Sequence, residues 1–285
     1  MSALAELRSK VATGAFERAA KWGKVPRRAY VHYFIESEGL HSRIHLQNFY
    51  STFWPQYDVP ATAHIKAHGA DGSELGTHDV QIPRFGSMFL EVRKLLQAIG
   101  ADASEGTVAI DLQPAPQVRK DFGDLPEPAT AQINTPFWMA YYDADENYMY
   151  VHSIERLDRE FFGTLKPISW LLSRTPSTGE HWRSWRLLDR DALSDLQIVV
   201  INHGTAPGRT TVGVYSRDDS VTLFERELEL APRQLERVVV PPEELASWPE
   251  RPEHVRIGLD PLLTANGKPY VLMRYNGGPL SIHHG

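Results

Sequence analysis

Short segments of alternating or continuous apolar residues, separated by turn sequences, run along most of the chain. The segments 210–215, 221–224 and 235–240 are rich in β-branched and aromatic residues, which is typical of β-strands. Asn266-Gly267 and Asn276-Gly277-Gly278 are among the turn sequences between such segments, and they favour tight hairpin connections. Strands about ten residues apart predict a mainly β protein of the sandwich kind.

The second half of the chain repeats the order of the segments in the first half. The paired segments, first copy then second, are 46–47 with 196–197, 61–66 with 211–216, 77–82 with 225–230, 88–92 with 235–239, 108–114 with 255–261, 136–142 with 269–275 and 150–152 with 281–283. We therefore predict an internal duplication that produces two tandem immunoglobulin-like β-sandwich copies. One large sandwich or barrel built jointly from both copies is the alternative.

The domain boundaries follow from this repeat. We place a helical arm at residues 1–28, the first β-sandwich copy at 29–153 and the second copy at 195–285. Residues 154–194 contain too many apolar and aromatic residues for a simple linker, because linkers are usually polar or rich in glycine and proline. We expect this stretch to be a partly helical connecting segment that packs across both copies.

The first 28 residues carry an amphipathic pattern. Apolar residues recur at three- and four-residue steps from Leu4 to Trp22, and Gly23 and Pro26 follow, so we predict a helix that ends there. Seven basic residues against two acidic ones in this segment favour an alternative role in peripheral contact with an anionic membrane. A helix packed on the domain, or a mobile arm, is the simpler interpretation.

Composition removes several classes of function. The 285 residues include no cysteine, which excludes disulfides, thiolate zinc sites and cysteine nucleophiles. The formal net charge of −6 gives no basic footprint, so we expect no nucleic-acid partner. The sequence has neither an apolar run like a signal-peptide core near its start nor an apolar stretch long enough to cross a membrane, and we expect a cytoplasmic protein.

Aromatic residues are the first candidates for a binding site. On the segment 136–142, alternation places Trp138 and Tyr142 on one face, and the opposite face is apolar as well. Such a strand is either buried on both sides or turns its second face to a ligand or partner. The ligand-binding residues that we predict are Trp54, Trp138, Tyr142, Tyr150 and Tyr275.

Three histidines near the ends of the two copies are the second candidates. His152 and His283 occupy equivalent positions in the repeat, and His284 follows directly. If the copies are related by a pseudo-twofold axis, these imidazoles would meet and bind a divalent metal such as zinc. Histidines that end their strands without any ligand are the simpler interpretation.

The motifs in the chain give no direct sign of catalysis. The sequence contains no Walker loop, no GxGxxG and no GxSxG motif, which counts against nucleotide binding and against an α/β-hydrolase. We predict a non-catalytic binding or interaction protein, without a cofactor, whose aromatic-lined cleft takes an apolar or ring-bearing small molecule or a protein partner. The alternative is a metal-assisted hydrolase, lyase or isomerase that uses the histidines at the repeat ends, so the sequence leaves enzymatic activity open.

Overall fold

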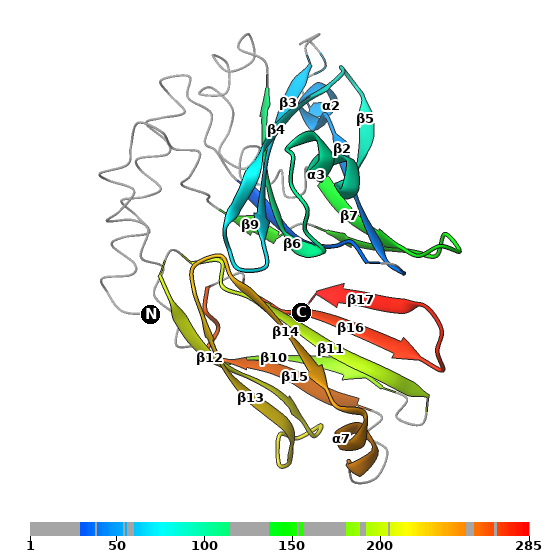
Figure 1. The fold of residues 1–285 in the computed structure, drawn as a ribbon, viewed down its shortest axis with the longest axis vertical. Coiled ribbons are helices and arrows are strands. Elements are labelled where there is room, and N and C mark those ends of the chain that lie inside the picture. The colour runs from blue at the N-terminus through cyan, green and yellow to red at the C-terminus, as the bar shows by residue number, and fades with distance from the viewer. Residues whose placement is uncertain are drawn as a thin grey trace.

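The described strands form four antiparallel sheets, arranged as two β-sandwiches (Figure 1). The computed structural model describes residues 29–37, 39–53, 55, 60–114, 137–152, 154–156, 181–188, 192–204, 206–248, 254–264 and 267–284. The predicted helical arm at 1–28 and most of the predicted connecting segment, residues 157–180, lie outside these ranges. The prediction of a mainly β protein is confirmed.

The first sandwich pairs a five-stranded sheet with a four-stranded one. Sheet I has the order β4 (Glu74–Ile82), β3 (Ala61–Gly69), β6 (Glu105–Pro114), β1 (Ala29–Ile35) and β9 (Ile154–Arg156). Sheet II has the order β5 (Ser87–Glu91), β2 (His41–Gln47), β7 (Phe137–Tyr142) and β8 (Tyr148–His152). Two short helices, α2 (Phe49–Phe53) and α3 (Val92–Ala98), follow β2 and β5.

The second sandwich has the same plan. Sheet III has the order β10 (Trp182–Leu187), β15 (His254–Asp260), β12 (Gly208–Tyr215) and β13 (Thr222–Leu230). Sheet IV has the order β14 (Leu235–Val240), β11 (Leu193–Ile201), β16 (Tyr270–Tyr275) and β17 (Leu280–His284), and α7 (Pro242–Ser247) follows β14. The order of sheet III repeats that of β4, β3, β6 and β1 in reverse, and the order of sheet IV repeats that of sheet II. The internal duplication is therefore confirmed, whereas the immunoglobulin-like assignment stays a prediction.

Both ends of the predicted connecting segment belong to the sandwiches. The strand β9 pairs with β1, and β10 pairs with β15 over residues 182–187. By its place in the sheet, β10 is the counterpart of β1. The repeat in the sequence did not reveal this equivalence. The reason is exposure: β1 is buried along its length, whereas β10 is an edge strand with a polar, partly exposed sequence.

Sheet IV is buried on both of its faces. One face, with Ile198 and Val271, packs against sheet III in the core of the second sandwich. The opposite face, with Val199, Leu272 and Ile282, joins the core cluster of the first sandwich. The same hydrophobic core therefore runs from one sandwich into the other.

Polar contacts surround this shared core. Glu105 on β6 accepts a hydrogen bond from the Tyr33 hydroxyl at 3.0 Å and another from Arg237 Nε of β14 at 3.1 Å. The backbone N–H of Leu235 donates to the carbonyl of Ala70 at 2.9 Å. Packing of the two sandwiches buries these polar groups, and the hydrogen bonds give each of them a partner.

Among the described residues, none of the helices has the length and apolar character needed to cross a membrane.

Candidate functional site

The outward surface of sheet II carries a cluster of aromatic and charged side chains that we call the aromatic face. Three of its large rings are strongly exposed: Phe89 at 59%, Trp138 at 45% and Tyr150 at 56%. The other members are Arg43, His45, Glu91, Tyr142 and Tyr148. Large exposed rings grouped on one sheet face are unusual for a surface that meets only water.

Strand register explains why these residues share a face. His45 on β2 lies opposite Phe89 of β5 on one side and opposite Trp138 of β7 on the other. Arg43, two residues earlier, lies opposite Glu91 and Ala140. Because side chains alternate along a strand, residues two apart on β2 and their partners on neighbouring strands all point outward.

Arg43 lies at the centre of the aromatic face. Its guanidinium carbon lies 4.7 Å from the ring centroid of Phe89, 4.8 Å from that of Tyr142 and 5.4 Å from that of Tyr148. Arg43 Nε donates to Glu91 Oε1 at 2.5 Å, and Nη1 donates to the Tyr148 hydroxyl at 3.1 Å. Cation–π contacts and a partly buried ion pair therefore hold the surrounding rings in place.

Burial and a hydrogen bond to Glu91 keep the Tyr142 hydroxyl protonated. Its hydroxyl donates to Glu91 Oε2 at 2.5 Å. Burial, followed by this hydrogen bond to a carboxylate, raises the pKa of Tyr142 to about 12. The phenol is therefore neutral and keeps its proton at every physiological pH.

His45 adds a neutral ring between the exposed aromatics. Its ring centroid lies 5.4 Å from that of Tyr150, edge to face, and 6.1 Å from that of Phe89. Burial, and then the charge of Arg43, lower the pKa of His45. Its buried Nε2 has no hydrogen-bond partner within the described part of the chain.

The structure brings together three of the five predicted ligand-binding residues. Trp138, Tyr142 and Tyr150 lie on the aromatic face of sheet II. Tyr275 lies far from them on β16, where it packs at the margin of the second core with its hydroxyl 3.7 Å from Met273 Sδ. Trp54 lies outside the described residues.

Sequence analysis missed Arg43, His45 and Phe89. The alternation of β2 shows that Arg43 and His45 share a face, but the sequence of β2 does not show which strands flank it. Pairing of β2 with both β5 and β7 joins segments up to about a hundred residues apart. A period-two pattern carries no information on such register.

Two of the three predicted metal-binding histidines meet at the surface between the sandwiches. Nε2 of His152 and Nε2 of His284 are 2.7 Å apart, and the two rings cross at 86°. His283 points to the other face of β17, where its Nε2 lies 2.7 Å from Ser281 Oγ. Within the described ranges, no group of three or more His, Cys, Asp or Glu residues is placed to hold a metal ion.

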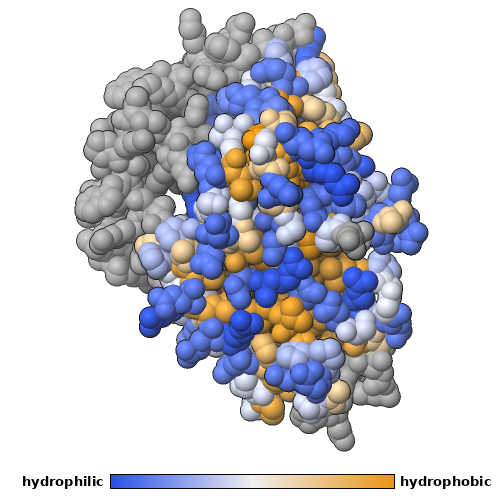
Figure 2. Space-filling model, in the orientation of Figure 1, coloured by the Kyte–Doolittle hydropathy of each residue, from blue (hydrophilic) through white to orange (hydrophobic). Residues whose placement is uncertain are grey.

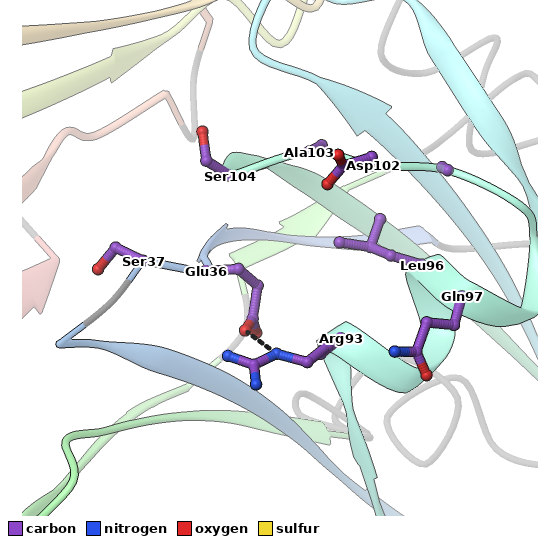
Figure 3. Close-up of a pocket in the computed structure, with 9 residues that line it drawn as sticks. Glu36, Ser37, Arg93, Leu96, Gln97, Asp102, Ala103 and Ser104 are labelled. Carbon is purple, nitrogen blue, oxygen red and sulfur yellow. Dashed lines mark ion pairs between the residues drawn. The ribbon is translucent and has the colours of Figure 1, made fainter.

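A polar pocket of about 530 Å³ lies beside α3 (Figure 3). In it Glu36 faces Arg93, with Glu36 Oε2 3.6 Å from Arg93 Nε. Glu36 also accepts from the N–H of Ser42 and lies 3.0 Å from Nδ1 of His41. Its carboxylate is thus satisfied by its own surroundings, and the pocket contains none of the predicted site residues.

Hydropathy alone does not locate a site. On the side of the molecule drawn in Figure 2, hydrophobic residues form separate groups over the two sandwiches, with hydrophilic residues between them. The aromatic face is distinguished instead by the type of its side chains, since Tyr, Trp and His combine an apolar ring with a polar group and therefore do not rank as hydrophobic in a hydropathy colouring.

No protein-family model and no curated protein matches the sequence. Among solved structures, a putative beta-galactosidase from Bacteroides fragilis shares 11% identity with a TM-score of 0.19, covering 91% of this chain and 32% of that one. A beta-glucuronidase from glycoside hydrolase family 2 shares 10% identity with a TM-score of 0.19, covering 91% of this chain and 24% of that one.

The N-terminal CBM22-1–CBM22-2 tandem domain of Xyn10C from Paenibacillus barcinonensis shares 7% identity with a TM-score of 0.16, covering 88% of this chain and 80% of that one. The chain spans about a third or less of the length of the first two structures. Likenesses at these TM-scores carry no information about the function of this chain.

Proposed function

We propose that this protein is a binding protein whose aromatic face holds a ring-bearing ligand. The observation that carries the proposal is the joint exposure of Phe89, Trp138 and Tyr150 on one sheet face. Water contact with large apolar rings is unfavourable, at roughly 25 cal/mol per Å² of apolar surface. A ligand that covers these rings removes that cost.

The chemistry of the face indicates what kind of ring it suits. Its exposed rings offer apolar faces, while the hydroxyls of Tyr148 and Tyr150 and the Arg43–Glu91 pair offer hydrogen-bonding groups. The charges of Arg43 and Glu91 balance one another, so a neutral ligand fits best. A molecule with apolar ring faces and hydroxyls around its rim, such as a sugar ring, matches both properties.

Preorganisation supports the same function. Arg43 and Glu91 are both partly buried, with side-chain exposures of 21% and 16%, and they restrain Tyr142 and Tyr148 before any ligand arrives. Fewer side-chain rotamers then have to be fixed on binding, and this lowers the entropic cost of association.

The test is binding of neutral oligosaccharides and of uncharged aromatic compounds, followed by tryptophan fluorescence and calorimetry. We expect Trp138→Ala and Tyr150→Ala each to weaken binding about tenfold or more, which corresponds to about 1.4 kcal/mol. The matched control is Trp185→Ala: this ring on β10 is 47% exposed and lies on the second sandwich. Equal affinity of wild type and the Trp138 and Tyr150 variants would contradict the proposal.

One observation favours a protein partner as the second candidate. The outward face of sheet IV, which the duplication makes equivalent to the aromatic face, is covered by the first sandwich. The same kind of surface thus packs against a β-sandwich in one copy and is left exposed in the other. If the small-molecule panel fails while Trp138→Ala abolishes association with another protein chain, the partner is a protein.

A further inference from the structure

His152 and His284 bring one imidazole from each sandwich to a single point. They are the last residues of β8 and β17, two edge strands with equivalent places in sheets II and IV. In register, His152 pairs with Trp138, the second residue of β7, and His284 pairs with Tyr270, the first residue of β16. In the sequence repeat His283 is the counterpart of His152, so the contact joins His152 to the residue that follows its counterpart, 132 residues along the chain.

The backbones behind these side chains are held firmly. The N–H of Ile282 lies 3.1 Å from Met149 Sδ, which joins β17 to β8 directly. Arg186 Nη2 donates to the carbonyl of His284 at 3.1 Å. Ile282 is 2% exposed and belongs to the core shared by the two sandwiches. The two Nε2 atoms are thus presented on rigid strands rather than on loops, as an effective binding site requires.

The spacing of the two nitrogens suits a common metal ligand set. Zinc binds imidazole nitrogen at about 2.0–2.1 Å with tetrahedral angles, so two histidines on one ion have nitrogens about 3.3 Å apart. In the structure the two Nε2 atoms are 2.7 Å apart. A small rotation of either ring toward solvent would move its nitrogen by a few tenths of an ångström and bring the nitrogen–nitrogen distance to about 3.3 Å. The two Nε2 atoms are now within hydrogen-bond distance of each other, and a bound ion would replace that contact.

We propose that His152 and His284 form a binding site for Zn²⁺ or a similar first-row divalent cation, and that this ion links the two sandwiches. Water molecules complete the coordination, because within the described ranges no third His, Cys, Asp or Glu is in place. Two ligands and the nearby positive charge of Arg186 imply a weaker site than a four-ligand structural zinc centre. The site borders the aromatic face, because the ring of His152 lies 6.1 Å from that of Trp138, but neither of its two ligands is among the residues proposed to hold the ring-bearing ligand.

The experiment is titration of the full chain, prepared without a polyhistidine tag, with zinc chloride in competition with a chromophoric chelator. We expect one equivalent of zinc in the wild type. His152→Ala and His284→Ala should each lower the affinity at least tenfold, and the double variant should lose little more, because both residues serve one ion. Zinc should also raise the unfolding midpoint of the wild type but of neither variant.

The matched control is His283→Ala, which removes the neighbouring histidine that points away from the pair. This variant should bind zinc as the wild type does. In EDTA, where no metal is bound, each variant must have the same unfolding midpoint as the wild type. If an alanine variant does not, His152→Gln or His284→Gln is used in its place. The proposal would be overturned if the wild type bound no equivalent of zinc, or if the wild type, the His152→Ala and His284→Ala variants and the double variant all had the same zinc affinity.

Discussion

At the contact between the two sandwiches, His32 on β1 is completely buried between aromatic rings. Its ring centroid lies 5.4 Å from that of Phe137 and 5.8 Å from that of Tyr270, whose hydroxyl is 3.0 Å from His32 Nδ1. Burial lowers the pKa of His32 to about 3. The imidazole is therefore neutral in the folded protein, whereas in the unfolded chain it takes up a proton near pH 6.5.

This difference predicts a loss of stability in acid. Below pH 6.5 the unfolded state binds one proton more than the folded state, so the free energy of unfolding falls as the pH falls from 6.5 toward 3. One such group contributes a slope of up to about 1.4 kcal/mol per pH unit. We expect the His32→Asn variant to be less stable than the wild type at pH 7. Its free energy of unfolding, measured by urea denaturation with EDTA present, should change less steeply with pH, by about this amount per pH unit. Equal slopes in the two proteins would refute this account of His32.

At the scale of single elements, β6 shows how closely the strands of sheet I approach. Gly106 lies opposite Gly69 of β3 and Phe34 of β1. A Cβ atom at Gly106 would lie 2.1 Å from the carbonyl oxygen of His68 and 2.8 Å from the ring of Phe34. The first of these is a backbone atom, so the strands themselves would have to separate to admit a methyl group.

We expect Gly106→Ala to lower the free energy of unfolding by about 1–3 kcal/mol, the usual range for overpacking. The matched control is Gly39→Ala, because a Cβ atom there meets no other atom within 4 Å. Urea denaturation of both variants measures the difference. The packing argument fails if the two substitutions have the same effect.

At the scale of the whole molecule, the sandwiches share one core through sheet IV. Leu272 on β16 is fully buried and faces the first sandwich, while its neighbour Val271 faces the second. A sheet that is apolar on both faces loses its cover on one side if either sandwich unfolds. We therefore expect both halves to unfold in one cooperative transition.

Leu272→Ala tests this coupling. Loss of the buried side chain should cost about 2–5 kcal/mol, and calorimetry, circular dichroism and tryptophan fluorescence should report one common, lowered midpoint. Val239→Ala on β14, the far edge strand of the same sheet, should change little, since Val239 is 46% exposed. Two separate transitions, of which only one responds to Leu272→Ala, would show that the sandwiches unfold independently.

The sequence by itself determined the mainly β character, the duplication and the order in which most strands follow one another along the chain. These depend on local alternation and on the order of segments, which are properties of the chain before it folds. The alternation of side chains along a strand likewise determined that Trp138 and Tyr142 share a face. The repeat in the sequence did not reveal that β10 is the counterpart of β1, because an edge strand tolerates polar residues that the buried strand β1 does not.

Only the tertiary structure decided which faces meet and which stay open. It placed Phe89, His45 and Trp138 side by side, and it paired His152 with His284 instead of His283. It also covered the outward face of sheet IV and left that of sheet II exposed. Register and sheet packing depend on contacts between distant segments, and a shift of one residue turns every side chain to the other face. The local pattern of residues does not contain that information.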